Sequence, residues 1–285
     1  MSTPRRSPLR RWTARFTVLA MAMVTLTACT KDEFLRQAMP LPATEQAERM
    51  LTLWQGSWIA AWALGLLVWG LIIWSSIFHR KKHNRLPAQV RYNMPIEALY
   101  TVIPIIIVAV FFYFTARDEA KLTDISKKPD VLVDVVAFQW SWKFYYENDG
   151  VHGQQMEDGV YIIGRAGQRP TLVLPKGKRV QFNLYSQDVT HSFWVPAFLF
   201  KRDVMPYKDP PPGKQYWQMP KNQKPYWNNK FQVVPTRQGT FAGRCAELCG
   251  ANHSKMLFKV KVVSWPEYKQ FINKTAAQQP TEGGS

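Results

Sequence analysis

Two long apolar runs stand out in the first half of the chain. Residues 51–78 contain no charged side chain, and a second uncharged stretch covers residues 98–116. Each is close to the roughly 20 residues that a helix needs to cross a bilayer. A core helix of a soluble protein rarely runs so long without a polar face, so the pattern favours a membrane hairpin over two buried helices. We predict transmembrane helices at 51–78 and 96–116.

Beyond a charged linker at 117–130 the pattern changes to short runs rich in Val, Phe and Tyr, separated by Gly, Pro, Asn and Asp. The runs cover residues 131–139, 142–147, 159–163, 171–174, 179–185, 231–234, 240–246 and 257–263. Short strands at this spacing predict an antiparallel sandwich or barrel at 131–270. Residues 203–230 are rich in proline and cannot pair as a central strand, so we expect a long surface loop there. The small, polar tail at 271–285 is predicted to be disordered.

A basic connector joins the two apolar runs and predicts their orientation. Residues 79–95 include the run His79-Arg80-Lys81-Lys82-His83, and short positive loops stay cytoplasmic. Residues 29–50 and the predicted β domain then lie outside the cell membrane. The net charge of +17 by itself would fit nucleic acid, anionic lipid or an acidic protein. The external location excludes cytosolic nucleic acid as a partner, and the external domain is itself basic.

The first 28 residues have the pattern of a secretory signal. Several arginines precede the short apolar stretch 16–26, and small residues follow it. The sequence Leu26-Thr27-Ala28-Cys29 resembles a bacterial lipobox, in which Cys29 becomes the lipidated first residue of the mature chain. A signal peptide with an incidental cysteine, or an uncleaved anchor, are the alternatives. Lipidation of Cys29 would leave the other two cysteines as an isolated pair.

That pair belongs to a cluster of soft metal ligands. Cys245, Cys249, His253 and Met256 fall within twelve positions, and a second imidazole, His191, lies upstream. Thiolate, thioether and imidazole together select copper over hard ions. Two bridging thiolates could hold two copper ions close together, each completed by one histidine and one weak ligand. The cluster therefore predicts a binuclear copper site.

The residues alone leave three other interpretations of the cluster open. A Cys-x-x-x-Cys pair outside the cytoplasm is often a disulfide. Zinc usually takes four Cys or His ligands without a methionine. A mononuclear blue-copper site would use one Cys, two His and an axial Met, and would leave one thiol over.

The run Cys245-Ala-Glu-Leu-Cys249-Gly-Ala-Asn-His253-Ser-Lys-Met256, with His191-Ser-Phe-Trp-Val-Pro196 before it, resembles subunit II of haem-copper cytochrome c oxidases. The resemblance covers residues 50–270. It implies a mixed architecture: an all-β, cupredoxin-like Greek-key barrel carried on a two-helix hairpin. It also implies that a binuclear copper (CuA) centre is held by six groups, namely the side chains of His191, Cys245, Cys249, His253 and Met256 and the backbone carbonyl of Glu247. The carboxylate of Glu247 would reach a magnesium ion at the boundary with subunit I.

Two further positions match the family. Phe138-Gln139-Trp140-Ser141-Trp142 resembles its aromatic stretch, which implies that electrons from cytochrome c enter at Trp140. The alternative is an ordinary strand aromatic in the core. Glu97 matches a family glutamate at the mouth of a proton path into subunit I, and its predicted cytoplasmic position fits that role. A glutamate at a helix start can also simply favour the helix dipole.

The resemblance implies a respiratory enzyme subunit in a bacterial cell membrane, with its copper domain on the outer side. It would accept electrons from cytochrome c and pass them to haem in subunit I, where O2 is reduced with proton pumping. The family usually surrounds its electron-accepting tryptophan with acids, whereas this domain is basic. That departure favours a tethered cytochrome in a supercomplex with the quinol-oxidising complex. The signal, the lipobox and the run at 198–203 resemble those of the family's actinobacterial branch. The alternatives are a quinol oxidase subunit, which lacks the copper ligands, and a lipoprotein scaffold with a Cys245–Cys249 disulfide.

Overall fold

The computed structural model describes residues 17, 30–80, 89–148, 151, 160–165, 167–206 and 229–279. The predicted lipidation site Cys29 and most of the predicted loop 203–230 lie outside these residues. The chain divides into two compact units, Met1–Met39 and Pro40–Ser285. In the first unit, helix α2 (Lys31–Leu35) begins at a capping box in which the side chains of Thr30 and Glu33 each accept a backbone N–H.

Two long helices open the second unit. Helix α3 spans Glu45–Phe78 and helix α4 spans Met94–Leu122, and both are long and apolar enough to cross a membrane. Thr44 and Asn93 cap their N-termini by accepting backbone N–H groups. Both helices run past the predicted limits. The start of the predicted linker at 117–130 is therefore the last turn of α4.

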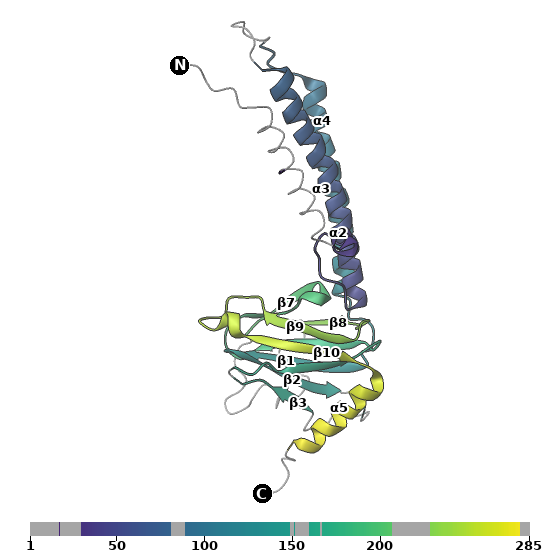
Figure 1. Cartoon of the computed structure of the whole chain (residues 1–285), viewed down its shortest axis with the longest axis vertical. Helices are drawn as coiled ribbons and strands as arrows, with labels where there is room; N and C mark the ends of the chain where they lie inside the picture. Colours follow the sequence, from purple (N-terminus) through teal and green to yellow (C-terminus); the bar gives the residue numbers. More distant parts are fainter. Residues whose placement is uncertain are drawn as a thin grey trace. The chain divides into compact units, whose positions relative to one another are not determined.

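Ten strands are found in the described residues, arranged in two sheets that face each other (Figure 1). They are β1 (Val131–Phe138), β2 (Ser141–Asn148), β3 (Tyr161–Ile163), β4 (Thr171–Pro175), β5 (Val180–Ser186), β6 (His191–Val195), β7 (Phe200–Val204), β8 (Lys230–Val233), β9 (Gly239–Cys245) and β10 (Leu257–Val263). One sheet has the order β3-β2-β1-β5-β8, and the other has β4-β10-β9-β6-β7.

The sheets are mixed, which corrects the antiparallel prediction. Strand β1 pairs parallel with β5, and β10 pairs parallel with β4, while the remaining neighbours are antiparallel. A parallel neighbour requires a crossover connection, and this chain crosses between the two sheets to make it. The result is a cupredoxin-like sandwich of two five-stranded sheets.

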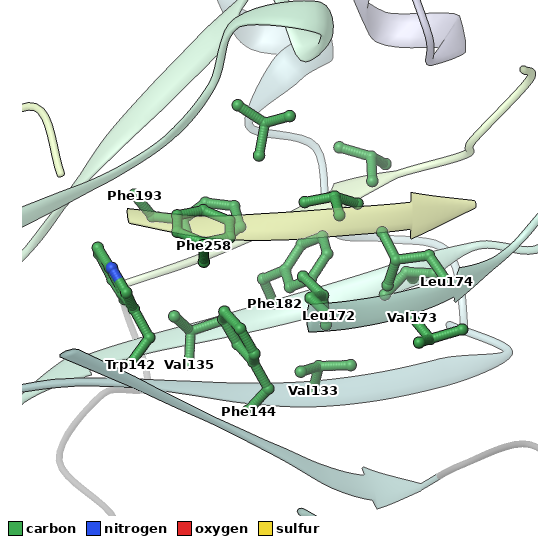
Figure 2. Close-up of a cluster of buried hydrophobic side chains, with 14 of the residues drawn as sticks. Val133, Val135, Trp142, Phe144, Leu172, Val173, Leu174, Phe182, Phe193 and Phe258 are labelled. Carbon is green, nitrogen blue, oxygen red and sulfur yellow. The ribbon is translucent and has the colours of Figure 1, made fainter. Parts of the chain in front are cut away.

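Aromatic side chains fill the space between the sheets (Figure 2). Phe258 of β10 stacks on Phe193 of β6, with ring centroids 4.9 Å apart, and meets Trp142 of β2 edge-on at 5.2 Å. All three side chains are at most 2 % exposed. Burying a phenylalanine side chain stabilises a fold by about 1.5–3 kcal/mol, so this cluster is a principal anchor of the two sheets. The cluster adjoins the predicted metal ligands, because the ring centroids of Trp142 and His191 are 6.3 Å apart.

The close approach of Phe258 to β9 depends on Gly243. A Cβ atom at this position would overlap the Phe258 ring. We expect Gly243→Ala to lower the free energy of unfolding by about 1–3 kcal/mol, because the ring must shift in a filled core. Thermal unfolding of the full chain, followed by tryptophan fluorescence, measures the effect. Gly70→Ala is the control, since a Cβ at that position in α3 meets nothing within 4 Å. Equal melting temperatures for the two variants would contradict the prediction.

The C-terminal segment is more ordered than the sequence suggests. Helix α5 spans Trp265–Gln278 and begins at a capping box formed by Ser264 and Glu267. Tyr268 and Ile272, four positions apart, are fully buried against the sandwich. The predicted disordered tail at 271–285 is therefore wrong for residues up to Gln278. The remaining residues of the tail, 280–285, lie outside the described part of the chain.

Candidate metal centre

Three connections at one end of the sandwich bring the candidate ligands together. They are the β1–β2 turn at 139–140, the β5–β6 turn at 187–190 and the β9–β10 loop at 246–256. Strand register aligns them, because Phe193 of β6 lies opposite Cys245 of β9. The Cys245 amide then donates to the Met256 carbonyl at 3.0 Å, which closes the loop. Ligands 54 residues apart thereby come together from neighbouring strands.

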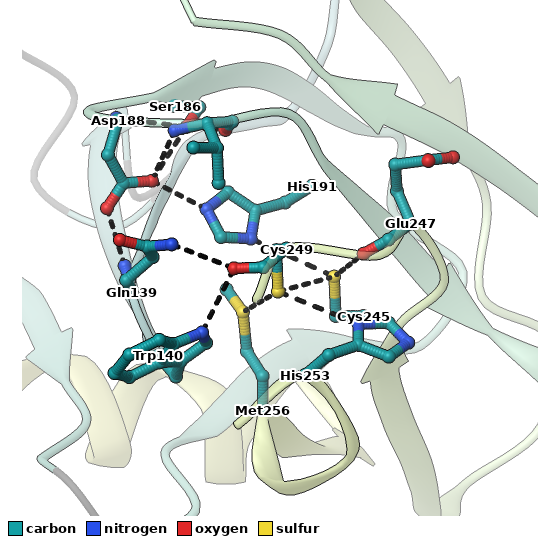
Figure 3. A network of polar contacts seen from close by, with 11 residues as sticks. Gln139, Trp140, Ser186, Asp188, His191, Cys245, Glu247, Cys249, His253 and Met256 are labelled. Atoms are coloured by element: carbon teal, nitrogen blue, oxygen red, sulfur yellow. Dashed lines mark hydrogen bonds and ion pairs between the residues drawn. The ribbon is translucent and has the colours of Figure 1, made fainter. Parts of the chain in front are cut away.

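The two sulfurs lie at the centre of the cluster (Figure 3). The Sγ atoms of Cys245 and Cys249 are 3.8 Å apart, far beyond the ~2.05 Å of a disulfide, and both thiols are free. The alternative with a structural disulfide therefore does not describe this structure. Nδ1 of His191 lies 3.8 Å from Cys245 Sγ, and Nδ1 of His253 lies 3.6 Å from Cys249 Sγ. Each thiol thus has an imidazole of its own.

Met256 and Glu247 complete the cluster. Sδ of Met256, fully buried, lies 3.8 Å from Cys249 Sγ. The backbone carbonyl of Glu247 lies 3.2 Å from Cys245 Sγ, whereas its carboxylate points away from the sulfurs in Figure 3. All six groups that the family resemblance implied are therefore in one place. His191, Cys245 and Cys249 alone already place their donor atoms within 4.8 Å of one another.

The two thiols differ in acidity. Burial raises the pKa of Cys245, but hydrogen bonds from His191 and from nearby backbone groups outweigh it and lower the pKa. Burial raises the pKa of Cys249, and the neighbouring Cys245 raises it further. One thiolate forms readily, and a second negative charge beside it needs a cation to compensate it. A metal cation held by these residues would supply that compensation.

Asp188 fixes the orientation of His191, a role that we did not predict from the sequence. Its Oδ1 accepts the Nε2–H of His191 at 2.8 Å, which leaves Nδ1 of the fully buried ring facing the sulfurs. Its Oδ2 accepts the Gln139 amide at 2.7 Å. Burial raises the pKa of Asp188, but these hydrogen bonds outweigh it and lower the pKa below its usual range. The side chain therefore stays a carboxylate.

Trp140 and Trp142 have separate environments. Trp140 lies in the β1–β2 turn rather than on a strand, is half-buried, and donates its indole N–H to the Cys249 carbonyl at 3.0 Å. The side-chain amide of Gln139, also missed from the sequence, donates to the same carbonyl at 2.8 Å. Trp142 is fully buried in the core. Of the two tryptophans, only Trp140 is both partly exposed to solvent and hydrogen-bonded to Cys249.

Glu97 lies elsewhere, in the first turn of α4. Its carboxylate accepts the Asn93 backbone N–H at 2.9 Å and so contributes to the helix cap. This contact is compatible with the helix-start alternative, and the proton-path role of Glu97 stays a prediction. Glu97 lies near the start of α4 and Asp118 near its end, 21 positions and roughly 30 Å of helical rise apart.

The donor set fits copper. It consists of two thiols, two imidazoles and a thioether, a soft and borderline combination that copper prefers and hard ions do not. Cys245, Cys249, Met256 and His191 are buried, so their donor atoms are shielded from water. These features define the class: a protein with a cupredoxin-like sandwich, two candidate membrane helices and a candidate metal site.

Comparisons with known proteins agree with this class. A family model described as the periplasmic domain of cytochrome c oxidase subunit II matches residues 218–263. The "probable cytochrome c oxidase subunit 2" of Streptomyces avermitilis is 50% identical over 310 residues, which cover 98% of this chain and 91% of the relative. The cytochrome c oxidase subunit 2 of Mycobacterium bovis is 38% identical and covers 90% of this chain and 79% of its own length. Among solved structures, the periplasmic domain of subunit II of the Bradyrhizobium japonicum cytochrome oxidase is similar, with TM-score 0.40 and 22% identity over 54% of this chain and 99% of that domain.

The chain belongs to the cytochrome c oxidase subunit 2 family. It is a component of an oxidoreductase complex, and membership of the family implies subunit I as its partner.

Proposed function

We propose that this chain holds a binuclear copper (CuA) centre, accepts single electrons from cytochrome c, and passes them to haem in subunit I. Oxygen reduction and proton pumping then take place in that partner. One observation carries the proposal: two free thiols lie 3.8 Å apart, each faced by its own imidazole nitrogen. Copper bound there supplies a site that gains and loses one electron with little change of structure.

The side chains around the thiols have distinct tasks in this proposal. Asp188 holds the His191 ring in one orientation, which keeps Nδ1 directed at the sulfurs. Met256 closes the cluster from the buried side. The indole of Trp140 is joined to Cys249 by a single hydrogen bond, so an electron arriving at the surface is one contact from a ligand.

The remaining assignments are also proposals. The exposed carboxylate of Glu247, directed away from the sulfurs, is available to a magnesium ion at the boundary with subunit I. Glu97 would serve the proton path from its place at the start of α4. Helices α3 and α4 would span the bacterial cell membrane with the sandwich outside, and Cys29 would carry lipid. These assignments follow the family pattern described above.

Trp140→Phe tests the electron-accepting role. The variant keeps an aromatic ring but loses the hydrogen bond to Cys249, and we expect the cytochrome-driven reduction of copper to slow by about tenfold or more. Stopped-flow absorption of the purified oxidase complex measures the rate. The control is Trp265→Phe, a half-buried tryptophan that stacks on Tyr268. An unchanged rate with normal copper content would contradict the role of Trp140, and a wild-type complex without copper would refute the proposed function.

A further inference from the structure

The surface beside Trp140 contains two shallow hollows. The first has a volume of about 330 Å³ and is lined by Trp140, Arg165, Arg169 and Lys255 among others. The second has a volume of about 230 Å³ and is lined by the side chains and backbone of β9 and β10. Arg169 and Leu257 line both hollows, so the two form one continuous surface.

This surface is strongly positive. Five cationic side chains line the two hollows, and we call them the basic face: Arg165, Arg169, Arg244, Lys255 and Lys259. All five are exposed. Within the described part of the chain, no carboxylate lines either hollow, and no ion pair involves any of the five. Clustered charges of one sign that lack counter-charges produce a potential of several kT at a protein surface.

Asp188, the acid that contacts His191, lines neither hollow. Asp188 already accepts hydrogen bonds from His191 and from the Gln139 and Val189 amides. Its charge is therefore directed at the metal cluster. Arg244 extends the basic face along β9, where its guanidinium lies 5.5 Å from the centre of the Trp194 ring. This contact holds the cation in place at the surface.

The chemistry of the face indicates a protein surface rather than a small anion as its occupant. A site for a small anion buries at least one charged anchor, which strengthens the interaction by excluding water. Here every cation is exposed, and the two hollows form one open surface that runs from Trp140 to strands β9 and β10. Several spaced positive charges on a shallow surface match an array of carboxylates on a partner.

We propose that the basic face is the docking surface of the electron donor, and that the donor presents acidic side chains around its haem edge. The proposal rests on the proposed function, because Trp140 lines the first hollow and leads to Cys249. A donor seated on the basic face would lie against the point where electrons enter. A basic cytochrome c would be repelled from the same surface.

A single cytochrome in two charge states tests the proposal. A basic soluble cytochrome c and the same protein with its lysines succinylated carry the same haem and opposite surface charge. Binding of each to the detergent-solubilised oxidase complex is measured as Kd at low and high salt, without electron transfer. The complex is also prepared with R165E/R169E and, as a control, with K269E/K274E, which reverses the same number of charges on α5.

The wild-type complex is expected to bind the succinylated cytochrome about tenfold more tightly than the native one at low salt, and the preference should fade as salt rises. R165E/R169E should abolish or reverse the preference, whereas K269E/K274E should keep it. A wild-type preference for the basic cytochrome would overturn the proposal, and so would equal behaviour of the two double variants.

Two further outcomes separate the competing explanations. If titration shows that inorganic phosphate binds, and R165E/R169E removes that binding without changing the Kd of the succinylated cytochrome, the face is a small-anion site and the docking proposal is wrong. Oxidation of a small neutral redox dye reports the proposed function separately, because the dye needs no docking surface. If the purified wild-type complex contains no copper and does not oxidise the dye, the proposed function is refuted. The cytochrome Kd still decides the docking proposal.

Discussion

Cys245→Ser is expected to abolish the copper centre and with it cytochrome-driven oxygen uptake. The thiol of Cys245 lies at the middle of the cluster, within 3.8 Å of Cys249 Sγ and of His191 Nδ1. A serine hydroxyl is a hard, poorly ionised ligand that cannot bridge two soft ions. Loss of a group that hydrogen-bonds to a metal ligand typically costs about 10–100-fold in metal affinity, so the loss of a direct ligand should cost more than about a hundredfold.

Copper per chain, measured by elemental analysis of the purified complex, and its visible absorption give the readout. Ser254→Ala is the control, because Ser254 is exposed on the same loop and its hydroxyl takes no part in the cluster. Co-purification with subunit I shows that the variant folds. A Cys245→Ser complex with wild-type copper content would contradict the assignment of the site.

Asp188→Asn is expected to weaken copper binding by about 10–100-fold while leaving every direct ligand in place. Two N–H groups, from His191 and from the Gln139 backbone, point at the two carboxylate oxygens. An asparagine offers one oxygen and one NH2 group, so one of these donors would face another donor. The His191 ring then loses its fixed orientation or the β1–β2 turn shifts.

Competition with a copper chelator measures the affinity in the Asp188→Asn complex. The control is Asp124→Asn, an exposed aspartate that accepts the Ser126 amide and can keep this bond as an asparagine. Identical chelator midpoints for the two variants would show that Asp188 does not position His191. Restored affinity in Asp188→Glu, with slower uptake of copper, would support a positioning role over a purely structural one.

The sequence was enough to group most of the candidate ligands, because they are rare residue types at fixed spacing. Cys245, Cys249, His253 and Met256 share one loop, so a local pattern is enough to group them. His191 was grouped with them by residue type alone, since nothing in the spacing shows that β6 pairs with β9. Asp188 and Gln139 were missed because an aspartate and a glutamine before a strand are commonplace, and only the fold brings them to the cluster.

Errors in the fold arose where the local pattern was ambiguous. Strand β7 (Phe200–Val204) contains three consecutive charged residues, so no strand was predicted there, and its last two residues were assigned to the proline-rich loop. Helix α5 has a polar sequence, and its order comes from two buried residues, Tyr268 and Ile272, that a short amphipathic pattern does not single out. The parallel pairings of β1 with β5 and of β4 with β10 are long-range, and strand patterns carry no information about them.

The pairing of Phe193 with Cys245 has a consequence for assembly. Side chains alternate between the two faces of a strand, so a slip of one residue between β6 and β9 would turn Cys245 away from His191. Only the native register can then offer the full set of donors. A ligand that binds one conformation stabilises it by RT ln(1 + [L]/Kd). Copper binding would therefore stabilise the native strand register relative to slipped registers. Newly made chains with slipped strands would gain nothing from the metal and would be left to rearrange or be degraded.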